Sequence, residues 1–360
     1  MAKSSFCGTQ LFGRGQMSFA ITIRQHDVPI AVEPGGTILE AALAQGVPYP
    51  HGCRSGNCGA CKSVLGSGEV DLAPYSDYAL TEQERSQGLI LACRAMPWSD
   101  ATVAWLETDE LAAHPLRQLT CRVIGLEDLT HDIKRVRLEI VAGGPFDFSA
   151  GQYAALRVSN LPARDFSMAN RPDDPAPEFH VRHMTGGAAS RYIVHKLGLG
   201  ETVRLEGPYG SAHLREHHTG PILAIAGGSG LAPITSIVET ALGRGARQPI
   251  HLYFGVRDER DLYLEEHFTA LAAAHPNLRF TPVLSEPLLA TARRRGFVHE
   301  AVAADLGDLD GAKAYIAGPP VMVEAATAML MDRGMPRQDI HADAFYTEAD
   351  KQALSTGATA

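Results

Sequence analysis

The chain has 360 residues, which at about 150 residues per domain gives two or three domains. Hydrophobic residues make up 45% of the chain and charged residues 20%, a globular composition that excludes bulk disorder. The formal net charge of −9 argues against nucleic acid or an anionic membrane as a partner. No apolar stretch approaches the roughly 18 residues of a membrane span, and the first residues lack the apolar core of a signal peptide. We therefore expect a cytoplasmic protein, in which six cysteines are too few for a disulfide scaffold.

The N-terminal region combines short strands, a short helix and a large share of the negative charge. We expect residues 1–16 to form a flexible extension, with Met17 as an alternative start, and residues 17–106 to form the first domain. Alternating apolar residues predict two strands joined by a turn at its beginning. Thr37, followed three residues later by Glu40, predicts the start of a helix.

The acidic character of this region has two interpretations. Residues 17–110 contain five Lys and Arg against 12 Asp and Glu, a net charge of −7. The charge could simply keep the surface well solvated. Alternatively it forms a docking face for a more basic partner, since such a field steers encounter.

Three cysteines share one loop of small residues. Cys53, Cys58 and Cys61 have the spacing C-x4-C-x2-C, and Cys93 follows after 31 intervening residues. This is the spacing of a plant-type [2Fe–2S] site, in which four thiolates bind the two irons. Small residues allow the loop to wrap tightly and to direct backbone N–H groups at the cluster sulfides.

A structural zinc site and a set of unrelated thiols are the other interpretations of these cysteines. Zinc sites commonly use two separate close-spaced pairs, whereas here three ligands share a loop, so the iron–sulfur cluster is favoured. Cys7 and Cys121 have no neighbouring cysteine and are interpreted as ordinary thiols.

The remainder of the chain divides into two regions of different pattern. Residues 107–117 are polar and predict a linker. Short strands separated by Gly, Pro and Asp fill residues 118–215, which predicts a small antiparallel barrel. In residues 216–348 apolar strands alternate with helical stretches, which predicts a parallel α/β sheet. Residues 349–360 are expected to form a flexible tail. The strands expected in the barrel include 120–124, 133–140, 153–158 and 178–182.

Several segments of the predicted barrel together form a candidate flavin site. Arg164 can pair with a phosphate, Phe166 offers a flat face to an isoalloxazine ring, and Ser167 can hydrogen-bond a ring nitrogen. The glycine-rich turn before Ser190 can open a helix whose free N–H groups bind a pyrophosphate. Each segment alone would be an ordinary surface strand or turn. The candidate flavin-binding residues are Arg164, Phe166, Ser167, Met168, His180, Arg182, Gly187, Ala188 and Ser190.

Three strand-to-helix turns of the third region are candidates for binding a dinucleotide. Gly228, Ser229, Gly230 and Pro233 form G-x-G-x-x-P, which allows close approach of a phosphate but differs from the strict G-x-G-x-x-G fingerprint. Alone, this turn fits a ligand loop and tight packing equally well. All three turns follow strands, and ligands of such sheets bind outside the carboxyl ends of the strands. The other two turns contribute Arg257, Asp261, Gly318, Pro319 and Met322.

With these motifs in this order, the sequence resembles the reductase components of bacterial multicomponent oxygenases. The similarity extends over about residues 18–346. Within that group the chain looks most like the ferredoxin reductases of naphthalene-type aromatic-ring dioxygenases. The similarity is carried by the segments PFDFSAGQYAALRV, THDIKRVRLEI, HTGPILAIAGGSGLAPITSIV, LYFGVRDERDLY and IHADAFY.

The resemblance implies a β-grasp [2Fe–2S] ferredoxin domain, an antiparallel FAD barrel and a parallel α/β NAD domain, with the cofactors bound at the residues named above. It assigns catalytic roles to Ser167 and to Phe345, which matches the aromatic that covers the flavin and moves aside for nicotinamide. An ordinary core or surface aromatic is the alternative for Phe345. Two residues depart from the family pattern: Phe166 stands where Tyr is usual, and Ala317 where Cys is frequent beside the nicotinamide. The second departure bears on the rate of hydride transfer.

The implied reaction follows from the number of electrons that each cofactor carries. NADH supplies two electrons as a hydride, a [2Fe–2S] cluster accepts one, and FAD can do both. The expected acceptor is a Rieske-type ferredoxin or a terminal oxygenase that dihydroxylates aromatic rings. NADH is favoured over NADPH because only Arg257 is available for a 2′-phosphate. The alternatives are the same cofactor chain serving a di-iron hydroxylase or a deoxysugar dehydrase and, in another class, a redox-sensing or scaffold protein.

Overall fold

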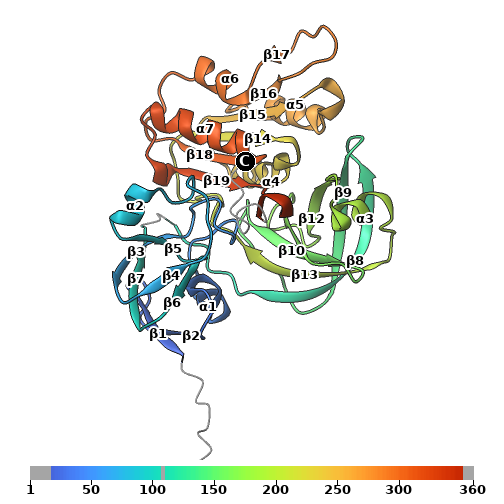
Figure 1. The fold of residues 1–360 in the computed structure, drawn as a ribbon. Helices are drawn as coiled ribbons and strands as arrows, with labels where there is room; N and C mark the ends of the chain where they lie inside the picture. Colours follow the sequence, from blue (N-terminus) through green and yellow to red (C-terminus); the bar gives the residue numbers. More distant parts are fainter. Residues whose placement is uncertain (1–17, 107–109, 352–360) are drawn as a thin grey trace, which may run out of the picture.

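The computed structural model describes residues 18–106 and 110–351 (Figure 1). Three large β-sheets follow one another along the chain, each with its own hydrophobic core, and the third has a core on both of its faces. The predicted extension 1–16, residues 107–109 of the predicted linker and residues 352–360 of the predicted tail lie outside the described residues. None of the helices in the described part is long and apolar enough to cross a membrane.

The first sheet is mixed, with strand order β2-β1-β7-β3-β5 and a parallel pair formed by β1 and β7. The hydroxyl of Thr37 accepts a hydrogen bond from the Glu40 N–H at 3.3 Å, which fixes the predicted start of α1. Helix α1 packs its buried face against the same core as the sheet. The elements are β1 (Phe19–Ile23), β2 (Ile30–Val32), α1 (Ile38–Ala44), β3 (Lys62–Ser67), β4 (Val70–Leu72), α2 (Glu82–Ser86), β5 (Leu89–Leu91), β6 (Ala95–Pro97) and β7 (Ala101–Trp105).

The second sheet has six strands in the order β11-β10-β13-β8-β9-β12, and all of its pairs are antiparallel. An antiparallel bridge between Met168 and Phe179 joins its two edges, so the sheet nearly closes into a barrel. The predicted strands are present, and β11 and β13 are additional ones. The elements are β8 (Arg117–Asp128), β9 (Ile133–Ala142), β10 (Tyr153–Val158), β11 (Arg164–Ser167), β12 (Glu178–Arg182), α3 (Ala188–His195) and β13 (Thr202–Tyr209).

The third sheet is parallel, as predicted, with strand order β17-β16-β15-β14-β18-β19. Every residue of β14 is buried, which explains its continuous apolar sequence. Helices α4 and α5 cover one face, and α6 and α7 the other. The strands are β14 (Ile222–Gly227), β15 (Ile250–Val256), β16 (Leu278–Leu284), β17 (Arg294–Arg295), β18 (Lys313–Gly318) and β19 (Ile340–Ala344). The helices are η1 (Gly228–Gly230), α4 (Leu231–Gly243), η2 (Glu259–Asp261), α5 (Glu265–Ala274), α6 (Val298–Asp305), α7 (Pro320–Asp332) and η3 (Arg337–Asp339).

The chain order of this sheet creates a switch point beside β14. The chain runs outward through β15, β16 and β17, then crosses back to form β18 on the other side of β14. Doubly wound sheets bind nucleotides at such a point, outside the carboxyl ends of the strands.

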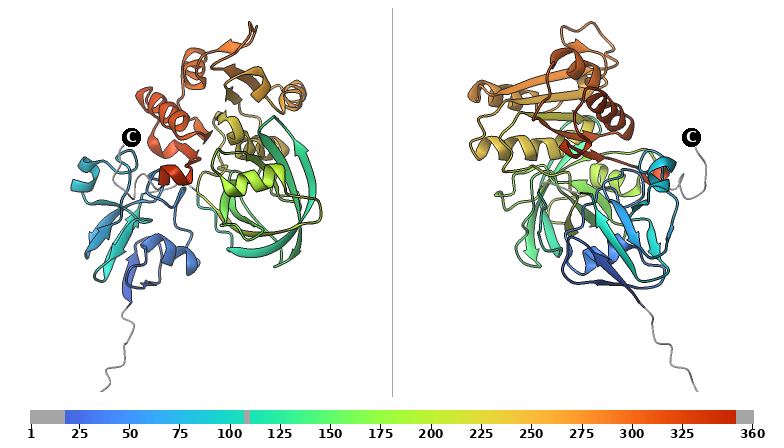
Figure 2. Two further views of the ribbon diagram at one scale, coloured as in Figure 1. Left: turned by 45° about the vertical axis from the view of Figure 1, so that its right-hand side comes forward. Right: turned by 90° about the vertical axis from the view of Figure 1, so that its left-hand side faces the viewer.

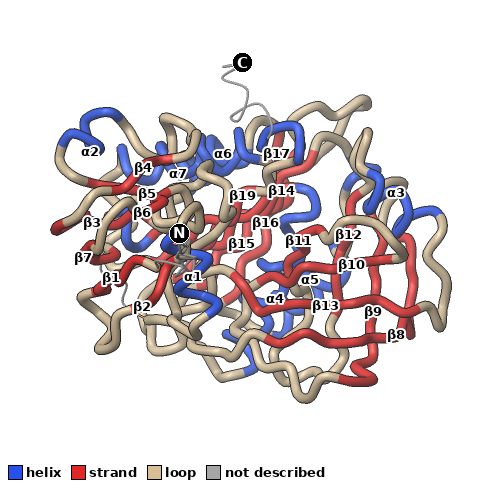
Figure 3. Tube along the Cα trace, turned by 60° about the horizontal axis from the view of Figure 1, so that its bottom comes forward, coloured by secondary structure: helices blue, strands red, loops and turns tan. Residues whose placement is uncertain are grey.

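The three sheets meet at the centre of the molecule (Figure 2). The segment after β19 passes between the first sheet and the barrel, and the Tyr346 hydroxyl donates to the carbonyl oxygen of Asn57 at 3.0 Å. The first sheet and the barrel also lie side by side when the molecule is seen from below (Figure 3). The cysteine loop of the first sheet therefore faces both of the other parts.

Candidate functional site

The cysteine loop brings the four predicted cluster ligands together. Cys53 accepts a hydrogen bond from the Asn57 N–H at 3.3 Å, and the Cys58 sulfur accepts one from the Cys53 N–H at 3.3 Å. The Cys93 N–H points at the Cys61 sulfur at 3.5 Å. The pKa of Cys53 is lowered to about 5, chiefly because the Cys58 thiol donates a hydrogen bond to its sulfur.

The loop fits a [2Fe–2S] cluster in both donor chemistry and backbone shape. Four thiolate ligands with backbone N–H groups directed at sulfur are the donor set of such a cluster. Gly59 has a φ of 75°, and a Cβ there would lie 2.9 Å from the Ala79 carbonyl oxygen, so only glycine fits at this turn. Cys121 is buried in the barrel core, away from the loop, and Cys7 lies outside the described residues.

A neutral histidine connects the cysteine loop to the barrel. Burial lowers the pKa of His51 to about 4. Its Nε2 accepts from the Gly210 N–H at 3.1 Å, which places the proton on Nδ1, 2.7 Å from the Tyr49 carbonyl oxygen. His51 is therefore a fixed structural group at the start of the loop.

The predicted flavin residues of β11 lie at the edge of the barrel that faces the cysteine loop and β19. Phe166 is partly buried against the barrel core, while Met168 is completely buried in that core. Arg164 is partly exposed and lies 3.8 Å from a Glu348 carboxylate oxygen. Ser167 donates to the carboxylate of Asp343 at 3.0 Å.

Asp343 is a site residue that the sequence analysis did not single out. Burial raises its pKa to about 7, against the lowering effect of the Ser167 hydroxyl, and the carboxylate of Asp165 and the thiolate of Cys53 raise it further. The residue lies in the segment IHADAFY, where an acidic residue stands between two alanines near the end of β19. This acidic residue near a strand end was the sequence feature that could have pointed to Asp343.

The other predicted flavin residues lie on β12 and at the start of α3. Gly187 is the N-cap of α3 and provides no side-chain hydrogen bond, so the first N–H groups of this helix remain free to bind an anion. Ser190 bonds to Gly187 and Met184 within this turn. Arg182 pairs with Asp132 at 2.8 Å.

The structure places His180 in the contact between the barrel and the third sheet. Its Nε2 lies 3.2 Å from a Glu178 oxygen, and its Nδ1 lies 3.3 Å from the Tyr263 hydroxyl. Both ring nitrogens therefore have protein partners, and a direct contact with a cofactor would require one of these bonds to break.

The three predicted dinucleotide turns meet at the carboxyl edge of the third sheet. A Cβ on Gly230 would overlap the carbonyl oxygen of Ala317, and one on Gly227 would overlap the Met322 sulfur. Close packing between the turns after β14 and β18 is thus one reason for the glycines. The helices that follow, α4 and α7, begin at the same edge, and neither has a side-chain N-cap bond.

The turn after β15 separates its two predicted residues. Asp261 is buried and accepts from the Asp258 N–H at 3.2 Å, so its carboxylate holds the turn. The side chain of Arg257 is 56% exposed and lies 3.8 Å from that carboxylate. Arg257 is the member of the pair that can reach a ligand.

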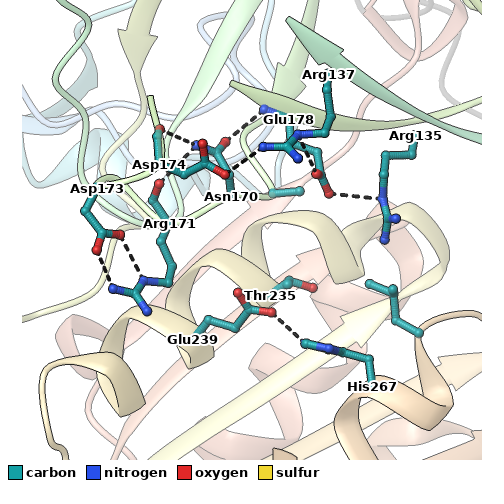
Figure 4. A pocket seen from close by; sticks show the side chains of 12 residues that line it. Arg135, Arg137, Asn170, Arg171, Asp173, Asp174, Glu178, Thr235, Glu239 and His267 are labelled. Carbon is teal, nitrogen blue, oxygen red and sulfur yellow. Dashed lines mark hydrogen bonds and ion pairs between the residues drawn. The ribbon is translucent and has the colours of Figure 1, made fainter. Parts of the chain in front are cut away.

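A cavity of about 490 Å³ lies between the barrel and helices α4 and α5 (Figure 4). None of the predicted cofactor residues lines it, although Glu178, which does, lies 3.2 Å from His180. The charges of the cavity are paired on each side: Arg137 lies 2.9 Å from Asp174 on the barrel, and His267 lies 2.7 Å from Glu239 on the helices. These acids and bases are therefore engaged with one another rather than turned toward a charged cofactor.

Family comparisons match all three parts of the chain. The 2Fe-2S iron-sulfur cluster binding domain matches residues 21–97, the oxidoreductase FAD-binding domain residues 120–214, and the oxidoreductase NAD-binding domain residues 224–328. The reductase component of the naphthalene 1,2-dioxygenase/salicylate 5-hydroxylase systems of Ralstonia sp. is 39% identical over 91% of this chain and 98% of its own length. The chain belongs to the family of iron–sulfur flavoprotein reductases that serve oxygenase systems.

Other reductases are also similar to this chain over nearly its whole length. The reductase component of phenol 2-monooxygenase from a Pseudomonas species is 39% identical over 93% of this chain and 96% of its own length. The crystal structure of an Amycolatopsis cytochrome P450 reductase has 39% identity and a TM-score of 0.77, covering 91% of this chain and 98% of the other. A ferredoxin reductase of carbazole 1,9a-dioxygenase has 29% identity and a TM-score of 0.69, covering 92% and 99%.

These comparisons confirm the predicted architecture and cofactor set. The reductase is an oxidoreductase with domains for a [2Fe–2S] cluster, FAD and NAD, and it passes electrons from NAD(P)H to an oxygenase system. The enzyme interpretation is thereby confirmed against that of a redox-sensing scaffold.

Proposed function

We propose that this reductase supplies electrons from NADH to a Rieske-type ferredoxin or terminal oxygenase that dihydroxylates an aromatic ring. The observation that carries the proposal is the similarity to a naphthalene 1,2-dioxygenase system reductase along 91% of the chain. A second naphthalene dioxygenase reductase, from Pseudomonas putida, is 38% identical over the same share. The acidic ferredoxin part fits a more basic acceptor.

The ligand roles are part of the proposal. Cys53, Cys58, Cys61 and Cys93 would hold the cluster. Residues of β11, β12 and the α3 turn would hold FAD, with the α3 N–H groups on its pyrophosphate. The turns after β14, β15 and β18 would hold NADH, with Arg257 near the adenosine end.

The roles of the cofactors and of the protein follow from the chemistry that each cofactor supplies. When bound, NADH supplies a hydride, FAD converts that electron pair into single electrons, and the cluster relays them one at a time. The chain provides the positions: the Phe345 N–H donates to the Gly318 carbonyl oxygen at 2.9 Å, which fixes this aromatic beside the nucleotide turn. Ser167 and Asp343 hold a proton beside the flavin strand.

Anaerobic titration with NADH, followed by visible spectroscopy, tests the proposed electron path. Bleaching of both the flavin band and the broad iron–sulfur absorbance is the expected result. Bleaching of the flavin alone would contradict the assignment of the cluster or its coupling. NADPH is titrated in parallel, and we expect it to be the poorer reductant.

A monooxygenase system is the second candidate acceptor. Phenol 2-monooxygenase reductase is as similar to this chain as the naphthalene dioxygenase relatives are. The discriminating experiment mixes the purified reductase and NADH with a Rieske dioxygenase or with a phenol-type hydroxylase. Substrate-dependent NADH oxidation coupled to product formation in the first mixture alone supports the proposal.

The domain limits and the location are also proposals. We place the ferredoxin domain at residues 17–106, the FAD barrel at 118–215 and the NAD domain at 216–348. Limited proteolysis is expected to cleave between the ferredoxin domain and the FAD barrel before it cleaves elsewhere. We further propose a cytoplasmic location, which is supported by the use of NADH and by the free thiols of the described cysteines.

A further inference from the structure

The cysteine loop is bonded to the barrel through its backbone. The Tyr153 hydroxyl donates to the carbonyl oxygen of Gly52 at 2.7 Å. The N–H and hydroxyl of Ser211 donate to the carbonyl oxygen of His51 at 2.8 and 2.9 Å. These bonds place the residues directly before Cys53 against the barrel.

The side chain after Cys53 extends this contact to the flavin strand. The guanidinium of Arg54 lies over the ring of Tyr209, 4.0 Å from its centroid, a cation–π arrangement. Its Nη2 lies 3.3 Å from Oδ1 of Asp165. Asp165 stands in β11 between Arg164 and Phe166, so Arg54 joins the cluster loop to the strand that carries the proposed flavin residues.

The backbone of Arg54 has a conformation that is unusual for a non-glycine residue. Its φ is 54°, and in the described part of the chain only two other non-glycine residues, Ser159 and Leu264, have a positive φ. A left-handed conformation at a non-glycine residue is unfavourable and persists only when surrounding contacts hold it. The contacts of the Arg54 side chain with Tyr209 and Asp165 can hold the backbone in this conformation.

The charge of Arg54 has a second consequence. A guanidinium stays protonated at every accessible pH. Arg54 directly follows Cys53 in the chain, so the proposed cluster loop, where reduction adds negative charge, carries this positive charge, partly balanced by Asp165. A fixed cation there favours the reduced cluster and raises its reduction potential.

We propose that Arg54 is a positioning residue for internal electron transfer: it clamps the cluster loop onto the flavin strand through Tyr209 and Asp165, and its charge tunes the cluster. This inference rests on the proposed function, because it assumes the cluster and flavin sites assigned above. Each NADH is oxidised to NAD⁺ with release of one proton to solvent, and its two electrons leave the flavin singly through the cluster and reduce two molecules of a one-electron acceptor outside. Arg54 itself is neither oxidised nor reduced.

Three variants separate the clamp from the charge. Arg54→Asn removes the contacts, and Asn tolerates a positive φ, so the loop can keep its fold. Arg54→Lys keeps the charge but loses the planar group that stacks on Tyr209 and reaches Asp165. Asp165→Asn weakens the clamp from the barrel side, without any change in the cluster loop. The matched control is Arg85→Asn on α2, an exposed arginine of the same domain that pairs with Glu82.

The measurements are anaerobic stopped-flow kinetics with NADH and an equilibrium redox titration of the cluster. In Arg54→Asn and Asp165→Asn, we expect about tenfold slower cluster reduction, equivalent to about 1.4 kcal/mol in the barrier. In Arg54→Asn, flavin reduction should be unchanged. The reduction potential of the cluster should be lower in Arg54→Asn than in the wild type. In Arg54→Lys the potential should equal that of the wild type, although electron transfer to the cluster stays slow. Hydrogen exchange at residues 50–58 should rise in all three variants and not in the control.

The outcomes distinguish this inference from the function on which it rests. If the wild-type cluster does not bleach with NADH, the proposed function fails. If the wild type transfers electrons and both Arg54→Asn and Asp165→Asn remain within about twofold of it, the clamp is wrong. If Arg54→Asn loses its iron while Asp165→Asn behaves as wild type, Arg54 only stabilises the loop, and the positioning role is again overturned.

Discussion

The hydroxyl of Ser167 donates to the carboxylate of Asp343 at 3.0 Å, joining two residues that are 176 positions apart in the chain. Ser167 ends β11 in the barrel, and Asp343 lies on β19 in the NAD part. The bond therefore connects the proposed flavin strand to the sheet that would bind NADH. Burial, acting on Asp343, raises its pKa to about 7, so this contact changes its protonation in the physiological range.

The first prediction concerns the pH dependence of flavin reduction. Below pH 7 the Asp343 carboxyl is largely protonated and can hold a proton beside the flavin strand, and above pH 7 it is a carboxylate that repels added negative charge. We expect the rate of flavin reduction by NADH to fall as the pH rises through about 7. Asp343→Asn should remove this step, whereas Asp332→Asn at the exposed end of α7 should retain it. Stopped-flow traces from pH 6 to 8 would decide the matter, and a step that survives in Asp343→Asn refutes the assignment.

The second prediction concerns stability. The Asp343 pKa is about 7 in the folded protein against an ordinary value of 3.8, so between these pH values the folded state binds more protons than the unfolded state. The contribution of Asp343 to stability is therefore present at low pH and is lost as the pH rises toward 7. The melting temperature of Asp343→Asn relative to wild type should increase from pH 5 to pH 8. A constant difference would show that the carboxyl does not titrate in this range.

The sequence predicts the local parts of this molecule well because their signals are local. The cysteine spacing, the alternating strands and the apolar strand β14 each depend on neighbouring residues, and the structure contains them. Contacts between the parts were not predictable, because no local pattern encodes them. The pairing of Ser167 with Asp343 and of Arg54 with Asp165 depends on how three separate cores pack together.

Some of the predicted residues also turned out to have structural partners that only the fold reveals. The Asp261 carboxylate holds the turn after β15. Gly230 allows the turn after β14 to lie close to the Ala317 carbonyl oxygen. Both residue types suit a nucleotide site and a tight turn equally well. Sequence pattern alone could not separate these roles, because packing depends on residues that lie far away in the chain.

The third prediction tests the cluster ligands. Cys58→Ser replaces a thiolate by a hydroxyl, which is a poor ligand for iron, so the broad iron–sulfur absorbance should disappear while the flavin remains. NADH oxidation with ferricyanide, which can take electrons from the flavin, should be retained, and reduction of cytochrome c should be almost abolished. Cys121→Ser in the barrel core is the control and should keep its iron. Full iron content in Cys58→Ser would exclude Cys58 as a ligand.

The fourth prediction concerns the packing of the glycine turn. Gly230→Ala would force a Cβ into the Ala317 carbonyl oxygen, and overpacking of this kind costs about 1–3 kcal/mol. We expect a lower free energy of unfolding and a raised KM for NADH, since the turn must move. At Gly307 an added Cβ meets nothing within 4 Å, so Gly307→Ala should be close to neutral. Urea unfolding and steady-state kinetics of both variants test this, and equal stability would show that the turn yields without cost.

The last prediction concerns recognition of the nucleotide by Arg257. Its side chain is 56% exposed at the carboxyl edge of the sheet and is only loosely paired with Asp261, so it is free to contact the adenosine half of the dinucleotide. An exposed charge–dipole or charge–phosphate contact contributes about 1 kcal/mol, so Arg257→Ala should raise the KM for NADH about fivefold and leave kcat unchanged. The effect on NADPH should be larger, because its 2′-phosphate would lose its nearest cation. Arg279→Ala on β16 removes an exposed arginine elsewhere and should change neither constant. Unchanged KM values for both nucleotides in Arg257→Ala would remove this residue from the site.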